Sequence, residues 1–139
     1  MLLVKTKIKS SDIAGIGLFA DQLIPKGTYI WRFKKGFDIR VEKDYPSTLE
    51  EPAKSFFMTY AYQIPKTLQY VLCADNARFI NHSDTPNTHC VEDPEDVDCA
   101  SVTSRDIEQG EELTVDYREF DTDPFYGFDK MGGQEQNIK

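Results

Sequence analysis

The 139-residue sequence has few cysteines and no long apolar run. Its three cysteines, Cys73, Cys90 and Cys99, form no Cys-x-x-Cys pair, which argues against a disulfide framework and against a zinc ribbon. No stretch is apolar enough to cross a bilayer, and the first residues lack the apolar core and the small-residue cleavage site of a signal peptide. We therefore expect a cytoplasmic protein without membrane association.

Positive charge is also scarce. The chain has 16 Lys and Arg against 24 Asp and Glu, a formal net charge of −8. Binding to phosphate backbones needs a cationic surface, so nucleic acid is not expected as a direct ligand. The carboxylates gather in residues 92–98 and 106–123. Such runs form either a solvated surface or a field that attracts a basic partner, and composition does not decide between the two.

Short apolar runs separated by Gly and Pro turns predict one mostly β domain. We expect strands within residues 2–9, 14–20, 24–33, 37–41, 69–74, 98–104 and 107–117. The strand in 37–41 is expected to pair with the preceding strand as a hairpin. One helix is expected within residues 46–62, capped by Ser47 or Thr48, with Phe56, Phe57 and Tyr60 on one face.

Gly15 and Gly17 stand two residues apart, but a dinucleotide-binding fingerprint is excluded. That motif needs a third glycine and a helix that begins at once, whereas residues 18–20 continue as a strand. What remains is backbone without Cβ atoms, which a ligand can approach closely.

Residues 78–87, RFINHSDTPN, carry more polar side chains than a turn requires. A histidine such as His82 is more often a structural hydrogen-bonding residue than a catalyst. A metal site would have to combine it with His89, Cys90 and Cys99, and no metal is expected because these spacings fit no zinc geometry. Ser-His-Asp catalysis is excluded because Ser83 follows His82 directly.

Three segments together are more specific than any one of them. GIGLFA (15–20), RFINHSDTPN (78–87) and GEELTVDY (110–117), in this order, resemble the signature motifs of the SET-domain protein-lysine methyltransferases. The resemblance spans about residues 4–117. It implies a mostly β SET-domain fold of several small antiparallel sheets, with one short helix and a C-terminal pseudoknot. It also implies a single domain over 1–139, with a closing segment at 118–130 and a frayed tail at 131–139.

The resemblance implies that the cofactor is S-adenosyl-L-methionine. The backbone of Ile16 and Gly17 would hold its methionine end, Asn81 would bind its amino group, and the main chain of His82 would pair with the adenine. Other residues would brace this loop or close the site. The expected cofactor-binding residues are Ile16, Gly17, Arg78, Phe79, Asn81, His82, Tyr117 and Phe125.

The implied reaction is methyl transfer to the side-chain amine of a lysine in a basic protein or peptide. Tyr117 matches the catalytic tyrosine of the family, and Tyr60 is expected in the aromatic wall of the lysine channel, with Tyr62 as the competing match. The positions that limit the number of methyl groups correspond to Cys90 and Val115, both small, so more than one methyl group is expected to fit.

The sequence departs from many family members because no Cys-rich zinc segment follows the tyrosine motif. Phe125, Tyr126 and Phe128 could close the site instead, or they could simply pack on a sheet. Three functional hypotheses stay open: the methyltransferase, a SET-like module that binds a peptide or partner without turnover, and a metal-dependent hydrolase built on His82 and His89. A homodimer that completes the site is a further expectation.

Overall fold

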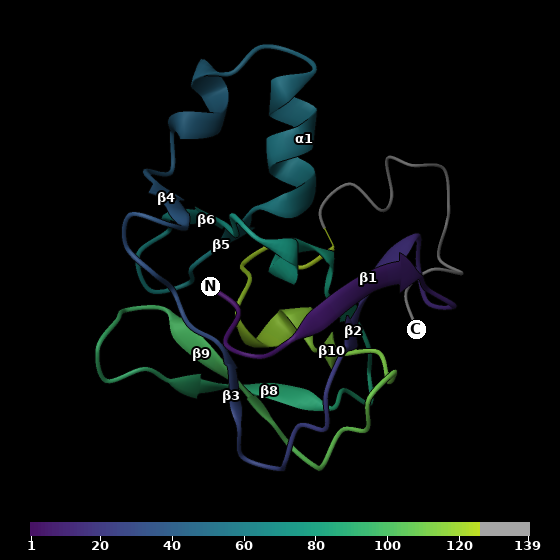
Figure 1. The fold of residues 1–139 in the computed structure, drawn as a ribbon. Helices are drawn as coiled ribbons and strands as arrows, with labels where there is room; N and C mark the ends of the chain where they lie inside the picture. The colour runs from purple at the N-terminus through teal and green to yellow at the C-terminus, as the bar shows by residue number, and fades with distance from the viewer. Residues whose placement is uncertain (126–139) are drawn as a thin grey trace.

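The computed structural model of this protein describes residues 1–125 (Figure 1). The described strands form four small sheets, in the orders β1–β2, β3–β9–β8, β4–β6–β5 and β10–β7. This mostly β architecture with one short α-helix confirms the predicted fold class. The strands are β1 (Thr6–Ser10), β2 (Ile16–Ala20), β3 (Tyr29–Trp31), β4 (Ile39–Val41), β5 (Tyr62–Gln63), β6 (Tyr70–Leu72), β7 (Asn81–His82), β8 (Thr88–Glu92), β9 (Cys99–Thr103) and β10 (Thr114–Val115). The helices are α1 (Ala53–Tyr60) and the 3-10 turns η1 (Tyr45–Thr48), η2 (Asn76–Phe79) and η3 (Tyr117–Glu119).

The antiparallel β1–β2 hairpin carries the Gly-x-Gly turn. Ser10 lies opposite Ile16, and the Ser11 N–H donates to the Gly15 carbonyl at 2.8 Å. Gly15 has a φ of 45°, in the left-handed region that glycine adopts without steric cost. Leu18 of β2 is fully buried, whereas β1 is mostly exposed. The hairpin is therefore anchored to the core by β2 and presents its turn at the edge of the core.

The predicted hairpin between residues 24–33 and 37–41 is wrong. β3 pairs with β9, and β4 pairs with β6, with Ile39 opposite Leu72. The buried carboxylate of Asp38 accepts hydrogen bonds from the Lys34 N–H at 2.9 Å and from the Ala74 N–H at 3.2 Å. These two bonds turn the chain after β3 toward the end of β6. β8, which was not predicted, completes the β3–β9–β8 sheet by pairing along its whole length with β9.

The predicted helix starts later than expected. Within residues 46–62, η1 forms a separate turn and α1 begins after Pro52, with no side-chain cap at either helix. The predicted caps at Ser47 and Thr48 are therefore wrong. Proline lacks an N–H group and its fixed φ suits a helix start, so Pro52 sets the beginning of α1.

The aromatic face of α1 divides between the interior and the surface. Phe57 is buried and its ring contacts those of Tyr45 and Tyr70, with centroids 5.4 and 5.8 Å apart. Phe56 is half exposed and packs on Tyr60, with ring centroids 5.0 Å apart. Only Phe57 anchors the helix, and Tyr60 at its last turn lies toward the rest of the molecule.

β7 and β10 form a parallel pair that joins two remote motifs. Asn81 lies opposite Thr114, and His82 lies opposite Val115. The side chain of Asn87 strengthens this junction, because it donates to the Glu112 carbonyl at 2.8 Å and accepts from the Thr114 N–H at 2.9 Å. The pairing of these two segments is the arrangement that the expected C-terminal pseudoknot requires.

A continuous hydrophobic core joins the sheets. Figure 1 shows α1 at one end of the molecule and the β3–β9–β8 sheet toward the other, with β10 between them. In residues 1–125, no helix is long and apolar enough to span a membrane. The buried core residues are Leu18, Ala20, Ile24, Ile30, Trp31, Ile64, Val71, Cys73, Ala77, Ile107 and Leu113.

Candidate active site

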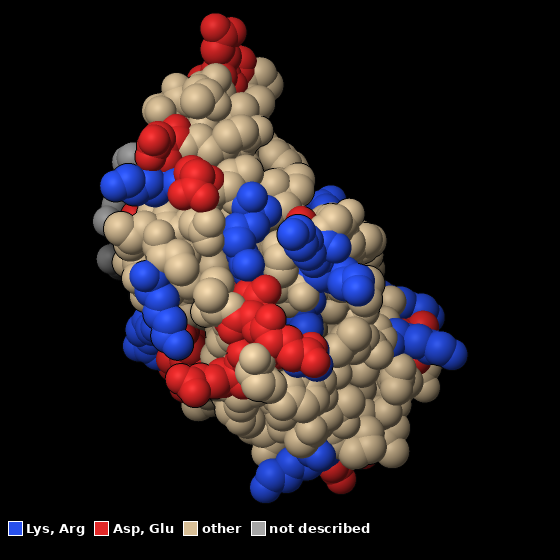
Figure 2. Space-filling view, turned by 90° about the vertical axis from the view of Figure 1, so that its left-hand side faces the viewer, with Lys and Arg blue, Asp and Glu red and all other residues tan. Residues whose placement is uncertain are grey.

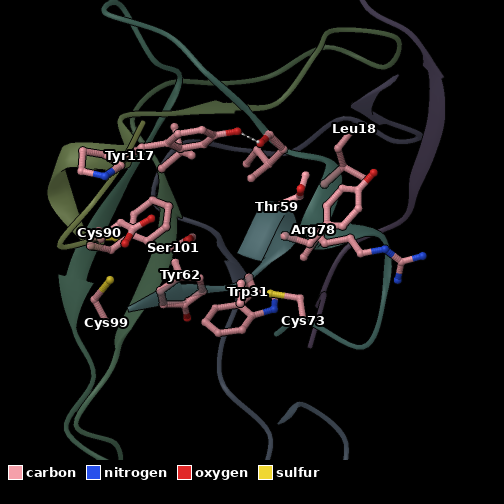
Figure 3. A pocket seen from close by; sticks show the side chains of 18 of the residues that line it. Leu18, Trp31, Thr59, Tyr62, Cys73, Arg78, Cys90, Cys99, Ser101 and Tyr117 are labelled. Atoms are coloured by element: carbon pink, nitrogen blue, oxygen red, sulfur yellow. Dashed lines mark hydrogen bonds between the residues drawn. The ribbon is translucent and has the colours of Figure 1, made fainter. Parts of the chain in front are cut away.

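The three sequence motifs converge on one cavity of about 440 Å³. Gly15 and Leu18 contribute from the Gly-x-Gly hairpin, Arg78 from η2, and Val115 and Tyr117 from the final motif. The labelled side chains of Figure 3 surround this common space, with Tyr117 and Tyr62 on the side of Cys90 and Cys99, and Leu18 and Arg78 opposite. Aromatic rings dominate the wall: Trp31, Tyr60, Tyr62, Tyr117 and Phe120 all line the cavity.

Tyr117 begins η3, two residues after the end of β10, and it lines the cavity. The hydroxyl donates to the Ile80 carbonyl at 2.6 Å, and the backbone N–H of Tyr117 donates to His82 Nδ1 at 3.2 Å. Burial raises the pKa of Tyr117 above its ordinary value, and the nearby Asp121 acts in the same direction. The phenol therefore stays protonated at neutral pH, and its proton is donated to the Ile80 carbonyl. The lone pairs of its oxygen can accept hydrogen bonds from a ligand.

Both candidates for the channel wall, Tyr60 and Tyr62, line the cavity. The Tyr60 ring lies edge-on to Phe79, with centroids 5.7 Å apart. The Tyr62 ring contacts Phe120 at 5.0 Å, and the Phe120 ring contacts Tyr117 at 6.0 Å. Tyr62 is thus connected to Tyr117 through one shared ring, whereas Tyr60 belongs to the wall beside η2.

Asn81 holds the Gly-x-Gly turn in place. Its Nδ2 atom donates to the carbonyls of Ala14 at 3.1 Å and Ile16 at 3.3 Å, and to Glu112 Oε1 at 2.9 Å. Ser11 Oγ donates to the same carboxylate at 2.8 Å. Because these contacts all use the nitrogen of Asn81, its side-chain oxygen is the atom that can accept from a ligand.

Glu112 is a residue of the candidate site that the sequence analysis did not identify. A Cβ atom on Gly17 would lie 2.2 Å from Glu112 Oε1, so a larger residue would displace this carboxylate from its hydrogen bonds to Ser11 and Asn81. Its neighbour Glu111 instead forms an exposed pair with Arg105 at 2.8 Å. The local sequence GEEL does not show which of its two glutamates points inward. The close approach of Glu112 to Gly17 identifies it, and this contact can be seen only in the folded structure.

Both ring nitrogens of His82 are already engaged. Besides Nδ1, which accepts from Tyr117, Nε2 lies 3.2 Å from Asp84 Oδ1, and the residue is only 4% exposed. Across residues 1–125, no group of three or more His, Cys, Asp or Glu side chains could hold a metal ion. The hydrolase hypothesis built on His82 and His89 therefore gains no structural support.

Arg78 and Phe79 lie on η2, whose start is fixed by Asp75, since its carboxylate accepts from the Ala77 N–H at 3.1 Å. The Arg78 guanidinium lies 4.8 Å from the centre of the Phe79 ring, and Phe79 packs on Tyr60. Arg78 also lines the cavity, while Phe79 supports it from behind.

Phe125 is the last residue that the structure describes. Its ring lies edge-on to His82, with centroids 5.1 Å apart. This contact places it beside the Asn81–His82 strand, as a closing residue would be. Tyr126 and Phe128, also expected in the closing segment, lie outside the described residues.

The acidic run 92–98 is held by partners within the chain. Arg32 binds Asp93 through two hydrogen bonds, the shorter 2.5 Å, and Arg40 binds Asp96 at 2.5 Å. The side chain of Asp93 is almost fully buried, and Arg32 holds its pKa below the ordinary range. The β8–β9 hairpin, at the left of Figure 1, faces the viewer in Figure 2, where acidic side chains form a band bordered by basic ones. These pairs tie the hairpin to β3 and β4.

The sequence model of the SET domain matches residues 15–118. The chain therefore belongs to the SET-domain family, as its three motifs predicted. Comparison with curated proteins gives no significant match.

Solved structures share the fold at low sequence identity. A candidate histone methyltransferase of Plasmodium falciparum is 20% identical, with a TM-score of 0.58 over 84% of this chain and 95% of that chain. A structure of ctPRC2 in complex with H3K27me3 and H3K27M is 18% identical, with a TM-score of 0.63 over 82% of this chain but only 14% of that chain. At these identities the likeness establishes the fold alone.

Proposed function

We propose that this SET-domain protein is an S-adenosylmethionine-dependent protein-lysine N-methyltransferase. One observation carries the proposal: the three motifs, which are remote in sequence, meet at one cavity that contains the Tyr117 hydroxyl. Methyl transfer to an amine is an in-line displacement, for which positioned groups supply much of the rate. No metal ligand and no protein nucleophile are needed.

The residues present fit the cofactor. The side-chain oxygen of Asn81 lies beside the Ala14 and Ile16 carbonyls, and this group of acceptors suits the amino group of an amino-acid moiety. Among the described residues, β7 pairs with β10 along one of its edges only. Its other edge can bind the adenine through the main chain of His82. Arg78 and Phe79 brace this strand, and Phe125 covers His82.

S-adenosylmethionine, when bound, supplies a methyl group on a positively charged sulfonium. The chain's own residues orient the lysine. The apolar wall of the cavity disfavours the ammonium form of the amine and lowers its pKa. The Tyr117 oxygen, with its proton held by Ile80, can accept a hydrogen bond from the neutral amine and stabilise nearby positive charge. Tyr60 and Tyr62 enclose the aliphatic part of the lysine.

We infer that the substrate is a lysine in a basic protein segment, because the chain carries a net charge of −8. The named neighbours, a candidate histone methyltransferase and a complex with histone H3 forms, are consistent with this class. We further propose that residues 1–139 form one SET domain with a closing segment at 118–130, that it acts in the cytoplasm, and that two copies can associate.

The first test is calorimetric titration with S-adenosylmethionine. The wild type should bind one equivalent, and Asn81→Ala should weaken binding at least tenfold. Ser11→Ala is the matched control, because it removes a hydrogen bond to the same Glu112 carboxylate without altering Asn81. Binding that is equal in the wild type and Asn81→Ala, or absent even with a Lys-rich peptide, would overturn the proposed site. Binding without transfer to any lysine peptide would favour the inactive binding module.

A further inference from the structure

A second tyrosine that lines the cavity donates its hydroxyl proton to a buried carboxylate. Tyr62 lines the cavity, and its hydroxyl donates to a carboxylate oxygen of Asp98. Asp98 is only 4% exposed and does not itself line the cavity. Tyr62 therefore links the buried carboxylate to the wall of the cavity.

The surroundings of Asp98 fix the carboxylate but do not neutralise it. One oxygen accepts from the Cys99 N–H at 2.9 Å, and the Asp98 N–H donates to Asp96 Oδ1 at 2.9 Å. Arg40, whose charge acts on Asp98, is paired with Asp96 at 2.5 Å. The titratable and charged groups around Asp98 are Tyr62 on β5, Arg40 on β4, Asp96 in the same hairpin, Cys73 after β6, Cys90 on β8 and Cys99 on β9.

We propose that Asp98 accepts the proton that the substrate lysine must lose, and that this proton travels through the hydroxyl of Tyr62. The inference rests on the proposed methyltransferase function. In the step, an N–H bond of the ammonium breaks and its proton binds the Tyr62 oxygen. The original Tyr62 O–H bond breaks at the same time, and that proton binds Asp98. A neutral amine, an unchanged phenol and a neutral carboxylic acid result.

Two other groups are less suited to this role. The Tyr117 hydroxyl donates to the Ile80 carbonyl, which cannot take up a proton at neutral pH. Asp121 lines the cavity, but one of its oxygens already accepts from the backbone N–H groups of Gln63 at 3.0 Å and Asp123 at 3.2 Å. Burial raises the pKa of Asp98 to about 6, close to neutral pH, where a proton acceptor works best.

The test is the pH dependence of single-turnover methyl transfer to a lysine peptide, with the Asp98→Asn, Tyr62→Phe and Asp121→Asn variants. The wild-type rate should level off above about pH 7. In Asp98→Asn and Tyr62→Phe the amine must lose its proton in water, so the rate should rise about tenfold per pH unit between pH 7 and 9. The two substitutions combined should cost no more than one alone, because both interrupt the same relay.

A second measurement needs neither cofactor nor activity. The carbon-13 signal of the Asp98 carboxyl should titrate near pH 6, and its midpoint should rise in Tyr62→Phe, which removes a hydrogen bond to the charged form. Parallel pH–rate profiles in the wild type and Asp98→Asn, a profile change confined to Asp121→Asn, or an ordinary Asp98 titration would each overturn the relay. A wild type that binds no S-adenosylmethionine and methylates no peptide would overturn the proposed function itself.

Discussion

Tyr117 and Tyr62 share one geometric feature at the scale of single residues. Each donates its hydroxyl proton to a fixed acceptor, the Ile80 carbonyl and the Asp98 carboxylate respectively, so each oxygen can only accept from a ligand in the cavity. When the N–H groups of an amine donate to both of these oxygens, the orientation of the amine and of its lone pair is fixed. The arrangement explains how two phenol oxygens can orient an amine in a cavity whose wall is mostly apolar and aromatic.

The Tyr117 hydroxyl should matter for turnover and little for cofactor binding. Tyr117→Phe should lower the methyl-transfer rate on the order of 100-fold, the usual loss when one positioned electrostatic group is removed. The affinity for S-adenosylmethionine, measured by calorimetry, should change less than threefold. A variant that binds the cofactor tenfold more weakly and transfers at the wild-type rate when saturated would contradict the assigned role.

Small side chains in the cavity should set the number of methyl groups transferred. Cys90 on β8 and Val115 on β10 both line the cavity. Cys90→Phe should shift the product toward monomethyl-lysine, because the larger ring fills space that a methylated amine needs. Mass spectrometry of a methylated peptide measures the distribution. Cys90→Ala is the control and should leave it unchanged, and an unshifted distribution in Cys90→Phe would disprove this assignment.

The buried carboxylate of Asp98 should also appear in the stability of the protein. Its pKa is about 6 in the folded chain against an ordinary 3.8, so the folded state holds this proton more tightly than the unfolded state. The stabilising contribution is complete below about pH 4 and is lost as pH rises through 6. The free energy of unfolding of the wild type, relative to Asp98→Asn, should therefore fall by roughly 2–3 kcal/mol between pH 4 and pH 7. Urea unfolding across this range measures it, and a constant difference would contradict the shift.

At the scale of elements, the Gly-x-Gly hairpin and the β7–β10 pair are joined through one carboxylate. Glu112 contacts Ser11 and Asn81, and its carboxylate occupies the space that a side chain at Gly17 would need. The turn that should hold the cofactor is thus positioned by a residue from the last motif. The β8–β9 hairpin is fixed in a comparable way by Arg32 and Arg40.

Gly17→Ala should disturb this junction. The added methyl group would meet Glu112 Oε1 at 2.2 Å, and the carboxylate would have to move away from Ser11 and Asn81, which costs about 1 kcal/mol for each hydrogen bond lost. The affinity for S-adenosylmethionine should fall at least tenfold. The same substitution in a Glu112→Ala background should cost clearly less stability in urea unfolding, because the clashing carboxylate is gone. Equal costs in both backgrounds would show that another neighbour of Gly17 is responsible.

At the scale of the whole molecule, the net charge of −8 should favour basic substrates. A peptide with Lys or Arg beside the target lysine should have a several-fold lower KM than one with Glu at those positions. The advantage should shrink between 50 and 500 mM salt, because screening weakens attraction over more than a few ångströms. Steady-state kinetics on the matched peptides tests this, and a salt-independent ratio would exclude a long-range electrostatic origin.

The local sequence predicted the strands and the helix better than it predicted which strands pair with each other. The strands in residues 14–20 and 98–104 and a helix within 46–62 are present, because alternation and Gly or Pro turns are local signals. The helix caps and the β3–β4 hairpin were wrong. Pro52 decides the helix start, and the buried Asp38 sends β4 to β6, which are effects of particular contacts.

The sequence alone predicted the family and the fold class, because three of its segments resemble, in order, the signature motifs of SET-domain proteins. Only the tertiary structure decided that Glu112 joins two of these segments, that Tyr62 connects with Tyr117 through Phe120, and that Asp98 lies buried behind Tyr62. The physical reason is distance along the chain. A carboxylate acquires its partners and its burial from residues far away in sequence, and its own neighbours in sequence do not reveal them.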